Sequence, residues 1–116
     1  MKGYQLIDNR QFDWPVTVHI PNRDGGSDKF SFTATFVARS PEDMADSIDA
    51  AQSPRAIKAD MLGQILVGWN GLQDQDGAPL EFTKDNIAAV ARDMFLTNAI
   101  LTAYRGATSA EMQRKN

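Results

Sequence analysis

The chain has 116 residues, a formal net charge of −3 and no cysteine, with 42% hydrophobic and 23% charged residues. This length suits one domain with a single core, and the composition is typical of a globular chain rather than a disordered one. The 12 Lys and Arg residues are spread among 15 acids, which argues against the dense basic face of a nucleic-acid-binding domain. Disulfides and Cys-ligated metals are excluded, and no stretch reaches the about 20 apolar residues of a membrane span. The sequence therefore predicts a cytosolic domain with neither nucleic acid nor membrane as a partner.

Two stretches in the first third alternate between apolar and polar residues, as half-buried strands do. In the first stretch, the apolar set is Trp14, Val16, Val18 and Ile20. In the second stretch, the residues on one side are Phe30, Phe32, Ala34, Phe36 and Ala38. Asp24, Gly25 and Gly26 lie between the two stretches and tolerate positive φ, so the pattern predicts a β-hairpin with a long loop. The residues GYQLI at 3–7 can add a short strand.

Two Ser-Pro pairs predict the start of two helices. The Ser side chain can accept a hydrogen bond from a free backbone N–H, and Pro at the first helical position lacks only an N–H that would have no partner in the helix. Ser40-Pro41 predicts the first of these helices, and Ser53-Pro54 predicts the second. We expect the second to run from about Pro54 to Val67 or Gly68, with a stripe of apolar residues four apart at Ile57, Met61, Ile65 and Trp69. The alternative is that residues 64–69, QILVGW, form a strand, because Gly63 weakens the helix.

The last third predicts further helices. Thr83 is expected to cap one that has Asp85 in its first turn. Thr97 is expected to cap a second, which Gly106 would end. One unbroken helix over residues 84–105 is the alternative. The predicted fold is therefore α+β, with an N-terminal β-hairpin or small antiparallel sheet followed by a bundle of three to four helices. It forms a single domain over residues 1–108, and a polar tail follows at 109–116.

The loop at residues 72–83, LQDQDGAPLEFT, is the strongest candidate for chemistry. With Gly77 as the sixth residue of an EF-hand loop, Asp74 and Asp76 fall at positions three and five. Leu72 and Thr83 then occupy positions one and twelve, where calcium needs acidic ligands. Asp-Gly and Ala-Pro are turn sequences, so we interpret the loop as a connection between two helical elements, with Trp69 packed beneath it.

No other residue pattern indicates catalysis. His19 is the only histidine and lies on the outer face of a predicted strand, without a partner for a metal site. The serines lack the context of a nucleophile elbow, and the Asp-Gly-Gly stretch is too short for a phosphate-binding loop. The sequence therefore predicts no enzyme, no catalytic residue, no cofactor and no metal.

Three stretches resemble the small tail assembly chaperones of long-tailed bacteriophages and their prophages. They are FDWPVTVHIP at 12–21, VGWNGLQDQDGAPLEFTKDN at 67–86 and AILTAYRGA at 99–107, followed by the terminal RKN. The resemblance covers most of the chain, and its most specific part is the extended acidic turn.

The resemblance implies a non-catalytic α+β domain in the host cytoplasm. It would bind the tape measure protein, help recruit tail tube subunits and be absent from the mature virion. It also implies that a longer, frameshifted form with a second domain can be made. The expected contacts with a partner are Trp69, Leu72, Phe95 and Leu96. A second copy of the chain, in a homo-oligomer, is a further expected partner. The alternative is a structural virion component, such as a head–tail joining or tail tube accessory protein, that assembles through an open strand edge.

Overall fold

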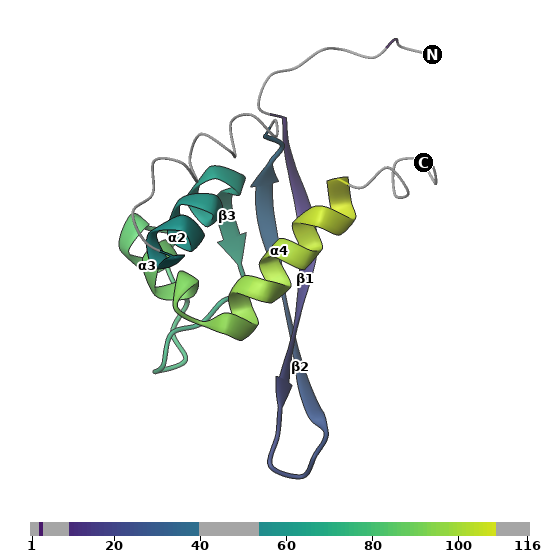
Figure 1. Cartoon of the computed structure of the whole chain (residues 1–116), viewed down its shortest axis with the longest axis vertical. Helices are drawn as coiled ribbons and strands as arrows, with labels where there is room; N and C mark the ends of the chain where they lie inside the picture. The colour runs from purple at the N-terminus through teal and green to yellow at the C-terminus, as the bar shows by residue number, and fades with distance from the viewer. Residues whose placement is uncertain (1–2, 4–9, 40–53, 109–116) are drawn as a thin grey trace.

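The computed structural model describes residues 3, 10–39 and 54–108 of the chain. The elements in chain order are β1 (Gln11–Pro21), β2 (Ser27–Val37), α2 (Pro54–Ile65), β3 (Leu66–Asn70), α3 (Lys84–Ala91) and α4 (Met94–Thr108). The strands form an antiparallel sheet in the order β1-β2-β3, and the fold is α+β as the sequence predicted (Figure 1). No helix within these ranges is long and apolar enough to cross a bilayer. The predicted helix after Ser40-Pro41 and the predicted tail at 109–116 lie outside the described residues, as does most of the predicted strand at 3–7.

One face of the sheet carries the core. The register of the hairpin places Val16 opposite Phe32 and Trp14 opposite Ala34, so the apolar residues of both strands share a face. Helical residues complete the core from above this face, and they are Leu62, Ile65, Val90, Ala91 and Ile100. The alternating pattern therefore predicted the strands and the buried face correctly.

The predicted apolar side of β2 is buried only in its middle part. Phe32 and Phe36 are buried, but Phe30 is 56% exposed and Ala38 is exposed beyond the end of β2. Phe30 keeps the side of the sheet that its position predicts. It lies opposite Val18, toward the turn end of the hairpin, and this end points away from the helices (Figure 1).

The helix that begins at Pro54 ends earlier than predicted. α2 stops at Ile65, and residues Leu66–Asn70 form β3, which pairs with β2. The alternative of a strand near residues 64–69 was therefore the better prediction for Leu66 onward. Trp69 does not continue a helical stripe, because it lies on β3 opposite Ala34. The loop at residues 72–83 therefore connects strand β3 to helix α3, not two helices as predicted.

The C-terminal helices are two, and the break differs from the prediction. Thr83 caps α3 as predicted, since its Oγ1 accepts from the backbone N–H of Asn86 at 3.1 Å. The cap of α4 is Asp93, whose Oδ1 accepts from the N–H groups of Phe95 and Leu96 at 3.0 and 3.1 Å. Thr97 is instead 1% exposed inside α4, and its hydroxyl donates to the carbonyl of Val90 at 3.1 Å. The predicted end at Gly106 is also wrong, because α4 continues to Thr108.

Tyr104 fastens α4 to the far end of β2. Its ring lies edge-on to Phe36, with centroids 5.3 Å apart. Its hydroxyl accepts from the N–H of Arg39 at 3.0 Å and donates to the carbonyl of Val37 at 3.3 Å. This anchor sets where α4 crosses β1 and therefore where its N-terminal residues meet the hairpin.

Candidate protein-contact surface

The hairpin extends beyond the rest of the sheet. Pairing between β2 and β3 reaches only from Phe36 to Thr33, so residues 27–32 of β2 pair with β1 alone. Among the described residues, no strand covers this outer edge of β2. Figure 1 shows the turn end of the hairpin pointing away from the helices. We call residues 18–30 the arm.

The turn of the arm is built by one side chain. Oδ1 of Asn22 accepts from the N–H groups of Asp24 and Gly26 at 3.0 and 3.1 Å. The N–H of Asn22 donates to the carbonyl of Gly26 at 3.0 Å, which closes the loop. Gly25 takes φ of +86°, a left-handed conformation that glycine adopts without steric cost. The predicted loop is therefore an ordered turn that holds the two strands in register.

A pocket of about 330 Å³ lies where the arm leaves the body of the domain. Its apolar lining comes from both strands, from the segment after β3 and from α4, and consists of Val18, Ile20, Phe30, Phe32, Leu72 and Leu96. The remaining lining residues are Ser31, Gly71, Gln73, Asp74 and Asp93. We call this site the arm pocket. It combines an exposed aromatic ring with aliphatic side chains, which is the composition of a contact surface.

Two of the four predicted contact residues meet in this pocket. Leu72 lies in the pocket because the chain turns after β3 at Gly71, which has φ of +100° and lies close to Phe32. The N–H of Leu80 then donates to the carbonyl of Leu72 at 2.9 Å, which holds the segment in place. Leu96 arrives from the first turn of α4, whose start is fixed by Asp93.

Trp69 lies elsewhere and has structural contacts. Its indole N–H donates to the carbonyl of Leu80 at 2.7 Å, and its ring lies edge-on to Phe82 with centroids 4.8 Å apart. The prediction that Trp69 packs beneath the loop is therefore correct, although it reaches that position from a strand. Phe82, which the sequence placed next to the Thr83 cap, serves as the partner of this indole.

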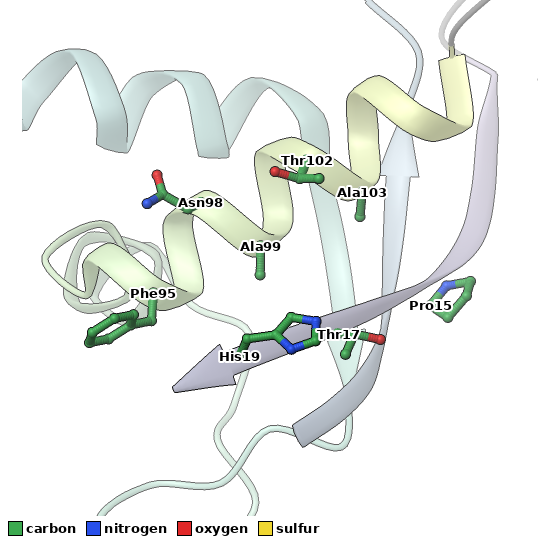
Figure 2. Close-up of a pocket in the computed structure, with 8 residues that line it drawn as sticks. All are labelled: Pro15, Thr17, His19, Phe95, Asn98, Ala99, Thr102 and Ala103. Atoms are coloured by element: carbon green, nitrogen blue, oxygen red, sulfur yellow. The ribbon is translucent and has the colours of Figure 1, made fainter. Parts of the chain in front are cut away.

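Phe95 faces a different hollow, the groove between α4 and β1. Figure 2 shows Phe95, Ala99 and Ala103 on the side of α4 that looks toward β1. The remaining lining residues are Pro15, Thr17, His19, Asn98 and Thr102, and the groove measures about 440 Å³. His19 is exposed on the outer face of β1, as predicted. The groove offers a shallow, largely uncharged surface, with no carboxylate in its lining to pair with the imidazole.

The acidic loop repeats the design of the arm turn. Oδ1 of Asp74 accepts from the N–H groups of Asp76 and Ala78 at 2.9 and 3.0 Å, and the N–H of Asp74 donates to the carbonyl of Ala78 at 2.8 Å. Gly77 takes φ of +83° at the place that Gly25 has in the arm turn. Asn22 makes the same three contacts in the arm turn, two through its neutral amide oxygen and one through its backbone N–H. Asp74 therefore acts here as a turn former, and no group of three or more potential metal ligands occurs in the described part of the chain.

Sequence reasoning missed Phe30 as a surface residue. It has the alternation of a core position, so periodicity alone assigns it to the interior. The available signal was its short distance from the turn, because residues near the tip of a long hairpin have the fewest neighbours from the rest of the domain. No local pattern in the sequence indicated that Leu72 and Leu96 would line the same pocket, because this depends on the path of the chain after β3.

Comparison of the chain with family models, with curated proteins and with solved structures finds no match. The resemblance to phage tail assembly chaperones stays a prediction from the sequence.

Proposed function

We propose that the chain is a non-catalytic phage tail assembly chaperone that binds apolar segments of the tape measure protein in the host cytoplasm during tail morphogenesis. The observation that carries the proposal is the apolar lining of the arm pocket, in which Phe30 is 56% exposed. A site of this kind covers apolar residues of a partner and so keeps the partner from associating with itself. Release would then allow tail tube subunits to take its place.

The position of Phe30 explains why it suits binding better than stability. The ring is 56% exposed, so burial of this side chain contributes little to the stability of the fold. The same area contributes to binding when a partner covers it, because a few well-covered residues, often aromatic, carry most of the affinity of a contact surface. Phe30 lies on β2 within the arm, whose turn end points away from the helices (Figure 1) and leaves room for a long client.

Co-expression with the tape measure protein encoded near the same gene tests the proposal. We expect the wild-type chain to keep the tape measure protein soluble and to co-purify with it. Phe30→Ser should reduce the amount recovered by at least about tenfold, since loss of a central aromatic contact typically costs 2 kcal/mol or more. Met94→Ser is the matched control, because Met94 is 60% exposed but does not line the arm pocket. Equal recovery with both variants would contradict the proposal.

A structural virion component is the second candidate, and the uncovered edge of β2 favours it. Residues 27–32 offer backbone groups to a strand from a neighbouring subunit, which is how several assemblies extend a sheet. Mass spectrometry of purified particles separates the two candidates. A chaperone is absent from finished particles, whereas a joining or tube accessory protein is present in a fixed number of copies.

A further inference from the structure

We infer that the arm pocket selects an amphipathic segment whose apolar residues are flanked by Lys or Arg. This inference rests on the proposed function, because it names the chemistry of the client segment. Two observations carry it, namely the apolar lining just described and the charges that surround it. Neither observation depends on the identity of the phage.

The charged residues in the lining of the pocket have one sign. Asp74 and Asp93 are both part of its lining, and no Lys or Arg is. Asp28 is opposite Ile20 in the hairpin register, so its carboxylate extends the acidic rim on the same face of the arm. Lys29 is next to Asp28 in β2, but successive side chains of a strand point to opposite faces, so Lys29 faces away. A basic client therefore meets two carboxylates in the lining and a third on the same face of the arm.

The charge of Asp74 is not needed for the turn that it forms. Asn22 makes the equivalent contacts in the arm turn through a neutral amide oxygen. The same holds for the cap of α4, since Asn caps helices about as well as Asp. Both carboxylates are therefore available to attract a cation while their Oδ1 atoms bind backbone N–H groups. The paired substitution of both by Asn removes the charge and keeps the geometry.

Two labelled peptides provide the probe. Each has about five helical turns with the same Leu stripe, and the residues that flank the stripe are Lys in one peptide and Glu in the other. Fluorescence anisotropy at about 0.1 M salt should show the Lys peptide binding at least about tenfold more tightly to the wild-type chain. At about 1 M salt, where the Debye length falls to about 3 Å, the preference should shrink to about twofold or less.

The variants separate local attraction from the overall charge of the chain. Asp74→Asn with Asp93→Asn should weaken binding of the Lys peptide about threefold to tenfold, as expected for two partly exposed ionic contacts. Asp76→Asn with Asp60→Asn removes the same total charge from outside the pocket and should leave the affinity within about twofold. Phe30→Ser should weaken both peptides, because it removes the apolar contact that they share. Thermal melts of each variant confirm that the fold is kept.

Several results would overturn the inference. These are equal affinity for the two peptides, no binding of either peptide at about 1 mM, and equal losses for the two paired Asn variants. The inference fails alone if the tape measure protein co-purifies while the peptides bind equally. The proposed function fails alone if the Lys preference is found at the arm pocket but the tape measure protein does not co-purify.

Discussion

Replacement of Trp69 by Ala tests whether this residue stabilises the fold or binds a partner. The indole joins three parts of the domain, since it lies on β3, donates to the carbonyl of Leu80 and packs against Phe82. It also packs against the main core cluster. Its removal should therefore loosen the segment between β3 and α3 as well as the edge of the sheet.

The contacts set the magnitude. Truncation of a large buried aromatic residue costs about 3–5 kcal/mol, and the partial burial of Trp69 places Trp69→Ala near the lower limit, at about 3 kcal/mol. Trp69→Phe keeps most of the ring packing and loses the hydrogen bond to Leu80, which contributes about 1 kcal/mol. For a domain of this size, 1 kcal/mol moves the Tm by about 4 °C. The expected decreases in Tm are then about 12 °C for the Ala variant and about 4 °C for the Phe variant.

Circular dichroism melts give both values, and co-purification with the proposed client, the tape measure protein, at low temperature gives the second readout. We expect both variants to bind the client as long as they remain folded. The reasoning is refuted if Trp69→Ala melts within about 2 °C of the wild type, which is about 0.5 kcal/mol, and yet loses the client. That result would assign Trp69 to the contact surface.

The remaining predictions concern the turns and the cap. Asp93→Ala should lower the free energy of unfolding by about 1 kcal/mol in urea titrations, because two N–H groups of α4 lose their acceptor, and a change under about 0.3 kcal/mol would contradict this cap. Gly77→Ala should cost about 1 kcal/mol through its positive φ alone, whereas Gly71→Ala should cost more, because its Cβ would also approach the Cβ of Phe32 to 3.3 Å. Urea titration of both Gly variants checks that order. Excess calcium should leave the Tm unchanged, because Asp74 binds its own loop, whereas a site at 100 times its dissociation constant would add about 2.7 kcal/mol.

The hairpin could be predicted because several local signals agree. Alternation defined the buried face, and the residues between the strands included Gly25, which adopts the positive φ that the turn requires. The two strands predicted from these signals are β1 and β2 of the structure. Pairing with β2 could not be predicted for Leu66–Asn70, because the partner strand lies about 30 residues earlier in the chain. A spacing of four along residues 57–69 fits one helix, and it also fits a helix followed by a strand that faces the same core.

The capping error at Thr97 has a similar origin. Asp and Thr are both good N-cap residues, so Asp93 and Thr97 compete on equal terms in the sequence. The tertiary structure selects Asp93, because the connection between α3 and α4 is short and both Val90 and Ile100 are buried in the core. Thr97 is then enclosed, and its hydroxyl binds the carbonyl of Val90 at the end of α3. Polarity in the sequence could not indicate that this hydroxyl would be buried.

The length of the strands accounts for the candidate surface. β2 has 11 residues and β3 has five, so about six residues of β2, or about 20 Å, extend past the shorter strand. An open edge of this length normally invites aggregation, and charged residues near the tip oppose it. Asp28 and Lys29 occupy such positions, whereas Phe30 follows directly and lies against the arm pocket. The charged residues that oppose aggregation therefore end where the arm pocket begins. This arrangement is expected if a partner covers this part of the arm.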